Sequence, residues 1–226
     1  MTFKELNLTQ NPFELISPSP LAFQSDAPIP WAGMKTQKEQ LENTYLNATA
    51  HHNLILNWGP FGAGKTHAAF YFKNQSFLNT EFITLYVKTP LEDSDATQQL
   101  LKDIIDEISF TKLKEIIKAR IAELGESQLF KLINTTIKSE VFATAIIKLG
   151  HSEPKLAEFM HRYVYGNVTR TELKQFQLPC ALNSEVDYLK FLAGIIAALT
   201  AGKTTRVVLC VPTLLQRISN DVPKII

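Results

Sequence analysis

Apolar residues return every three or four positions from Gln98 to Thr200, the spacing that places them on one face of a helix. Glycines and Pro154 interrupt the pattern, and Thr169-Arg-Thr-Glu172 has the spacing of a capping box before another apolar residue. The middle of the chain is therefore predicted to be helical throughout. We expect helices at residues 98–109, 113–124, 129–137 and 141–149, from 154, at the capping box of 169–172, and at 186–200, the last capped by Asn183 or Ser184.

Short apolar runs bounded by glycine or proline predict strands outside this region. They cover residues 53–58, 81–88 and 206–211, and the last two are rich in β-branched or aromatic side chains. Helical patterns occupy residues 36–50 and 65–74. The arm before them is rich in proline but too apolar for a free tail, so we expect it to lie along a folded body. Strands alternating with helices predict an α/β fold.

Composition narrows the range of functions. The chain has 226 residues, with 23 Lys+Arg against 22 Asp+Glu, and this balance gives no whole-chain attraction to nucleic acid or to an anionic membrane. The apolar stretch from Phe191 to Gly202 is shorter than the roughly 20 residues that span a bilayer. The N-terminal residues lack the apolar core of a signal peptide. Cys180 and Cys210 form no CxxC pair, so we interpret them as reduced core thiols and expect a cytoplasmic protein with no membrane partner.

One motif carries the chemistry. Residues 59–66 fit G-x-x-x-x-G-K-[ST], follow a predicted strand and open a predicted helix, a context that an accidental glycine-rich turn would not share. Glycines let backbone N–H groups surround phosphates, and the helix N-terminus adds its dipole. Lys65 can reach the β- and γ-phosphates, and Thr66 can coordinate Mg²⁺. The motif predicts binding of ATP or ADP with Mg²⁺ through Gly59, Pro60, Phe61, Gly62, Ala63, Gly64, Lys65 and Thr66, with His67 near the phosphates.

We interpret several other polar and aromatic residues as structural rather than functional. The pair His51-His52 lies at a predicted helix end without acidic ligands, and His151 lies at a helix start. Trp31 and Trp58 are expected to be packing residues. Acidic residues alternate with a run of basic side chains, which predicts the solvated face of an amphipathic helix. These basic residues are Lys112, Lys114, Lys118 and Arg120.

Hydrolysis needs more than the phosphate loop. Phosphate-loop enzymes place an acidic residue beside the metal, at the end of another strand of the same sheet. The apolar strand at 206–211 is the best such strand, yet Pro212 and Thr213 follow it. No catalytic residue is identifiable, and we expect weak or no hydrolysis by this chain alone.

Several segments resemble AAA+ ATPases of the origin-recognition type. They are Asn11-Pro12-Phe13, Trp31-Ala-Gly33 with Gln40-Leu41, and LILNWGPFGAGKTHAAFYF. The stretch Tyr165 to Lys174, followed by Phe191-Leu-Ala-Gly and RVVLCV, is similar to the insert before Walker B in bacterial ATPases that accompany BREX-type anti-phage systems. The resemblance implies that residues 59–66 are Walker A, that Ile29 to Gly33 lie near the adenine, and that DNA is a partner. Met34 occupies the position of the usual arginine.

The resemblance also implies a sheet in the order 5-1-4-3-2, of which the chain offers strands equivalent to 1, 2 and 3. Sensor 1, the arginine finger and the helical lid would lie beyond residue 226. The strand at 206–211 then pairs directly with 54–58, or another chain supplies strands, or the coding sequence is truncated by a frame change near Val211. We expect an incomplete P-loop NTPase core, with an arm and helix at 1–52, the P-loop strand-helix-strand at 53–90, a helical insertion at 91–205, and a third strand with an irregular tail at 206–226.

Two other functions fit the same loop. A small-molecule kinase or phosphotransferase shares it, but such enzymes bring several arginines to a lid, and the arginines here form no such cluster. They are Arg120, Arg162, Arg170, Arg206 and Arg217. The other alternative is a non-enzymatic interaction module, whose helical middle would be a surface for a homo-oligomer or a partner subunit, with nucleotide as a structural ligand.

Overall fold

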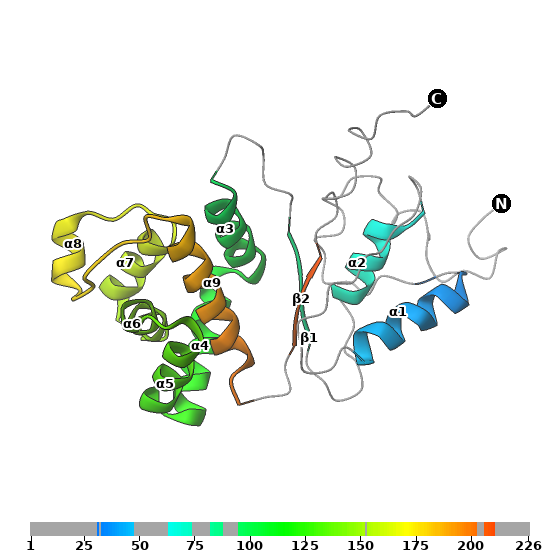
Figure 1. Cartoon of the computed structure of the whole chain (residues 1–226), viewed down its shortest axis with the longest axis horizontal. Helices are drawn as coiled ribbons and strands as arrows, with labels where there is room; N and C mark the ends of the chain where they lie inside the picture. The colour runs from blue at the N-terminus through cyan, green and yellow to red at the C-terminus, as the bar shows by residue number, and fades with distance from the viewer. Residues whose placement is uncertain are drawn as a thin grey trace, which may run out of the picture. The chain divides into compact units, whose positions relative to one another are not determined.

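Helices dominate the structure, a computed structural model that describes residues 31, 33–47, 63–73, 82–87, 95–151, 153–202 and 206–210 (Figure 1). Two parallel strands accompany the helices in this part of the chain, so the expected α/β class is confirmed. The chain divides into two compact units, Met1–Leu78 and Asn79–Ile226. The expected strand at 53–58, the proline-rich arm before Trp31 and the tail after residue 210 lie outside the described residues.

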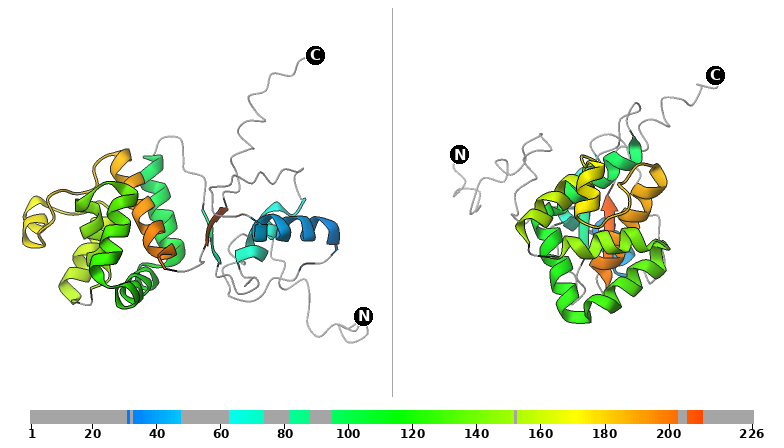
Figure 2. Two further views of the ribbon diagram at one scale, coloured as in Figure 1. Left: turned by 60° about the horizontal axis from the view of Figure 1, so that its bottom comes forward. Right: turned by 90° about the vertical axis from the view of Figure 1, so that its left-hand side faces the viewer.

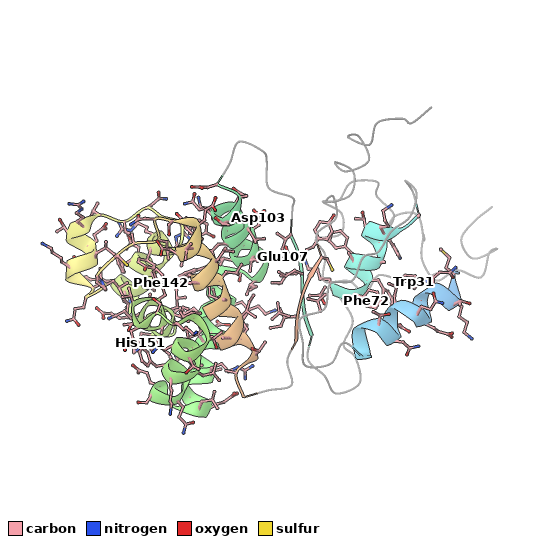
Figure 3. All side chains as sticks on the ribbon, in the orientation of Figure 1. Trp31, Phe72, Asp103, Glu107, Phe142 and His151 are labelled. Atoms are coloured by element: carbon pink, nitrogen blue, oxygen red, sulfur yellow. The ribbon has the colours of Figure 1, made fainter. Side chains whose placement is uncertain are left out.

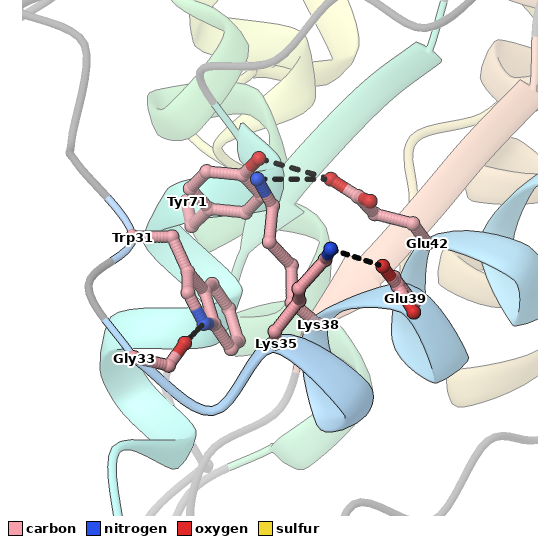
Figure 4. A network of polar contacts seen from close by, with 7 residues as sticks. All are labelled: Trp31, Gly33, Lys35, Lys38, Glu39, Glu42 and Tyr71. Carbon is pink, nitrogen blue, oxygen red and sulfur yellow. Dashed lines mark hydrogen bonds and ion pairs between the residues drawn. The ribbon is translucent and has the colours of Figure 1, made fainter.

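The first unit contains helices α1 (Lys35–Asn47) and α2 (Lys65–Lys73), close to their predicted bounds. An aromatic side chain joins them. The Tyr71 hydroxyl donates to Glu42 Oε1 at 3.0 Å, and Lys38 Nζ lies 5.3 Å from the centre of the Tyr71 ring (Figure 4). Tyr71 is buried, so these contacts fix the helix α2 against α1.

The second unit contains the strands β1 (Phe82–Tyr86) and β2 (Arg206–Cys210). They pair in parallel, with Phe82 opposite Arg206 and Tyr86 opposite Cys210. The Val87 N–H extends the ladder by donating to the Cys210 carbonyl at 2.9 Å. Parallel neighbours need a crossover connection, and here the crossover carries the whole helical region between the two strands.

The helices of this crossover agree with the apolar spacing, and Figure 2 shows them from two further directions. Two of these helices begin with a capping box, formed by Thr169 with Glu172 in one and by Ser184 with Asp187 in the other. The two residues of each box are only three positions apart in the sequence. The bounds are α3 (Ala96–Ile108), α4 (Phe110–Leu124), α5 (Glu126–Ile137), α6 (Glu140–Leu149), α7 (Pro154–Val164), α8 (Arg170–Gln175) and α9 (Glu185–Thr200).

Helix α9 is the centre of the helical core, in contact with α3, α4, α5 and α6. Phe191 on α9 meets the ring of Phe142 edge-on, with centroids 6.4 Å apart (Figure 3 labels Phe142). Gly194 lets α9 approach α6 closely, since a Cβ at this position would lie 2.4 Å from Ile146 Cδ1. No described helix has the length and apolarity to cross a membrane.

The prediction of a solvated helix face is wrong for one of its four basic residues, Arg120. Lys112 and Lys118 are exposed and Lys114 is half-buried, but the Arg120 side chain is buried. Its guanidinium reaches the end of α9, where Nη2 donates to the Leu199 carbonyl at 3.1 Å. The carbonyls at a helix C-terminus attract a cation, which explains why this one basic residue turns inward.

Candidate nucleotide-binding site

The described part of the phosphate-loop motif runs from Ala63 through Thr66, and His67 follows it. Gly64 has φ +80°, a left-handed backbone conformation that glycine adopts without a steric penalty. Helix α2 begins at the next residue, and its first hydrogen bond runs from Ala68 N–H to the Gly64 carbonyl at 2.9 Å. The predicted helix start is therefore confirmed. Gly59, Pro60, Phe61 and Gly62 lie outside the described residues.

The first turn of α2 has features that suit an anion. Gly64 has no side chain with which to cap the helix, and the first turn carries no acidic residue. Lys65 is half-buried and Thr66 is exposed. A lysine at a helix N-terminus is electrostatically unfavourable, because the dipole already makes this end positive. A bound phosphate would offset both charges.

Trp31 packs against α2 on the same unit (Figure 4), as expected for a packing residue. Its ring lies 6.0 Å from the His67 ring and 5.0 Å from the Tyr71 ring, both edge-on. The indole N–H donates to the Gly33 carbonyl at 3.0 Å. The candidate residues His67 and Trp31, distant in sequence, are thus adjacent. Trp58 lies outside the described residues.

A carboxylate that sequence reasoning missed lies at the carboxyl end of β1. Glu107 on α3 lies beside β1 (Figure 3) and accepts a hydrogen bond from the Tyr86 N–H at 3.2 Å. The Val87 N–H points toward β2, so the Tyr86 N–H points to the opposite edge of β1. Glu107 covers that edge. No motif marks the residue, and only the fold brings it to the strand.

Metal ligands are not concentrated in the described part of the chain, where no group of three or more His, Cys, Asp or Glu side chains could hold an ion. Thr66 is the metal ligand that the motif predicts. Cys180 and Cys210 form no disulfide, and both residues are half-buried, with Cys180 packed against the hydrophobic core. The carboxylate positions after β2, Pro212 and Thr213, lie outside the described residues.

From the sequence, the other histidines are predicted to have no role in nucleotide binding. His51 and His52 lie outside the described residues, whereas His151 precedes α7, as predicted. His151 Nε2 lies 3.8 Å from Glu126 Oε2, and both side chains are exposed. They border an open depression of about 350 Å³ whose apolar lining comes from Phe130, Ile147 and Leu156. An exposed pair at this distance contributes little to stability.

Comparisons with protein-family models, with curated proteins and with solved structures gave no match. The resemblance to AAA+ ATPases is therefore a prediction from the sequence segments alone.

Proposed function

We propose that the chain binds ATP or ADP with Mg²⁺ through residues 59–66, as a nucleotide-binding domain of AAA+-like type. The observation that carries the proposal is the complete motif, together with a helix that opens at Lys65 directly behind the left-handed Gly64. In this role backbone N–H groups of the loop bind the phosphates, Lys65 neutralises their charge and the Thr66 hydroxyl coordinates the metal.

The strand pairing supports the AAA+-like arrangement of the core. In the order 5-1-4-3-2, strands 2 and 3 are parallel neighbours and strand 2 is at the edge. The strands β1 and β2 are likewise parallel neighbours, and the Glu107 carboxylate accepts the Tyr86 N–H on the side of β1 that faces away from β2. Carboxylates on an edge also discourage pairing with a further strand.

We propose further that turnover is weak or absent. The positions that follow β2 hold Pro212 and Thr213, and neither side chain can replace an acid that orients a metal-bound water. Glu107 is not a substitute in this proposal, because its carboxylate accepts the Tyr86 N–H and so serves the strand edge. Binding without turnover is then the expected behaviour.

Thermal denaturation tests the binding. With ligand at about 100 times its Kd, the stability of the folded chain rises by about 2.7 kcal/mol, and the melting temperature rises with it. We expect this increase with ATP and ADP in the presence of Mg²⁺, and its loss in Lys65→Ala. Lys73→Ala is a matched control at the other end of the same helix and keeps the increase. Equal melting curves with and without nucleotide would remove the proposal.

Phosphate release tests the second half. We expect the wild-type chain with Mg·ATP to release phosphate at the rate of Lys65→Ala, which is the background. If the wild-type chain hydrolyses ATP rapidly and Lys65→Ala does not, another group replaces the acidic residue that is missing after β2. Binding would then stand and the absence of hydrolysis would not.

A further inference from the structure

Trp31 lies on one face of α2, where His67 and Tyr71 are a helical turn apart. Its ring centre is 6.0 Å from His67, 5.0 Å from Tyr71 and 6.4 Å from Phe72 (Figure 4 shows Trp31 beside Tyr71). Helix α2 has nine residues, too few to be stable in water without tertiary packing. Its direction and rotation therefore depend on contacts such as these.

The backbone directly before α1 has two consecutive residues with positive φ, and this turn keeps the Trp31 indole in place. Gly33 has φ +71° and the next residue, Met34, has φ +45°. A left-handed conformation costs energy in a residue with a side chain, and Met34 is 57% exposed, so burial does not compensate. The turn brings the Gly33 carbonyl to the indole N–H of Trp31, at 3.0 Å.

We propose that Trp31 is a positioning residue for the phosphate end of the nucleotide site. By packing on His67 and Tyr71 it holds the first turn of α2, with Lys65 and Thr66, in the orientation that the phosphates require. The inference rests on the proposed function and assigns Trp31 to the polyphosphate. The resemblance instead places residues 29–33 near the adenine, where Trp31 would contact the base.

The two roles differ in their dependence on the base. Titration calorimetry of the full chain with Mg·ATP and with Mg·tripolyphosphate, which has no base, separates them. We expect Trp31→Ala to weaken both ligands by the same factor, about tenfold. Trp31→Phe keeps a ring against α2 and should stay within about threefold of wild type for both.

Phe110→Ala is the matched control. The Phe110 ring meets His161 edge-on at 5.0 Å, so the substitution removes the same kind of contact in the other unit. It should leave both affinities unchanged. Trp31→Leu fills part of the indole volume and is the second variant if Trp31→Ala does not fold, as judged by circular dichroism. It should weaken both ligands equally.

Several outcomes would overturn the inference. Loss of ATP affinity with unchanged tripolyphosphate affinity would show that Trp31 contacts the base. Unchanged affinity of Trp31→Ala for both ligands would also contradict the positioning role. The same holds if the wild-type chain binds Mg·ATP but does not bind Mg·tripolyphosphate. A wild-type chain that binds neither ligand would instead remove the proposed function on which the inference rests.

Discussion

The guanidinium of Arg120 closes the C-terminus of α9 by donating from Nη2 to the Leu199 carbonyl at 3.1 Å. The last turn of α9 has no basic residue of its own, so α4 supplies the cation. Nη1 of the same side chain lies 2.8 Å from Glu123 Oε2, and the guanidinium is therefore bonded to two acceptors while buried. The Glu123 contact holds the guanidinium within α4, and the Leu199 contact fixes the end of α9 that leads to β2.

Removal of this side chain should be costly. Arg120→Ala leaves the Leu199 carbonyl without its donor and empties the space of a buried side chain, so we expect a loss of about 3 kcal/mol in the free energy of unfolding. Arg120→Met fills much of that space and should cost about 1.5 kcal/mol, the hydrogen-bond part alone. Urea denaturation followed by circular dichroism measures both.

The control for this prediction is Lys118→Ala on the exposed face of the same helix, which should change stability by less than about 0.5 kcal/mol. Glu123→Gln should also be mild, because the Glu123 side chain is 45% exposed and its ion pair is screened by water. If Arg120→Ala is no worse than Lys118→Ala, the contact to α9 contributes nothing.

Gly194 provides a second test of the helical core. Alanine at this position would place Cβ 2.4 Å from Ile146 Cδ1 and 3.3 Å from side-chain atoms of Ile133 and Ile137. Overpacking of this kind costs about 1–3 kcal/mol, and the better helix propensity of alanine offsets about 1 kcal/mol, so Gly194→Ala should lose about 1 kcal/mol.

A double mutant identifies the cause. Ile146→Val removes the Cδ1 atom that the new methyl group would meet, so the two substitutions should compensate each other. We expect the loss in the double mutant to be about 1 kcal/mol smaller than the sum of the single losses, as measured by chemical denaturation. Strict additivity would locate the strain of Gly194→Ala elsewhere.

Helix positions were predictable because their causes are local. Apolar spacing, the proline that begins α7 and the capping boxes at Thr169 and Ser184 all act within about four residues. The environment of Arg120 was not predictable, because Leu199 is 79 residues away and the basic spacing on α4 matched a solvated face. A single basic residue that turns inward leaves no periodic signal.

The candidate site likewise has a part that was predictable from local sequence and a part that depends on tertiary contacts. The loop residues and the helix start at Lys65 follow from a contiguous motif, whose spacing reflects the size of a phosphate group. The packing of Trp31 on His67 and the hydrogen bond from Tyr86 N–H to Glu107 join residues from different elements. Single tryptophan and glutamate residues carry no pattern, and only tertiary contacts reveal what they do.

Acid sensitivity should be traceable to Glu172. Its pKa lies below the ordinary value because the Thr169 backbone N–H and hydroxyl donate to the carboxylate, each at 2.8 Å, and because Arg162 is adjacent. A depressed pKa adds stability that is complete above the unfolded value of 4.5 and is lost as the pH falls through the lower, folded value.

We therefore expect Glu172→Gln to reduce the difference in stability between about pH 7 and pH 3, with most of its effect at the higher pH. Melting temperatures of both proteins across this range provide the measurement. Glu158→Gln, at an exposed position on α7, is the control for the loss of a surface carboxylate. Parallel pH profiles for wild type and Glu172→Gln would contradict the assignment.

Lys138 offers a stabilising substitution at the end of α5. It caps the helix with φ 51° and ψ 46°, the left-handed conformation that glycine adopts most readily, and its side chain is exposed. Lys138→Gly removes the steric cost and should raise the free energy of unfolding by about 0.5–1 kcal/mol, after the larger chain entropy of unfolded glycine is subtracted. Lys138→Ala keeps a Cβ and should give no increase. A higher urea midpoint for both variants would show that loss of the lysine charge, rather than backbone strain, is responsible.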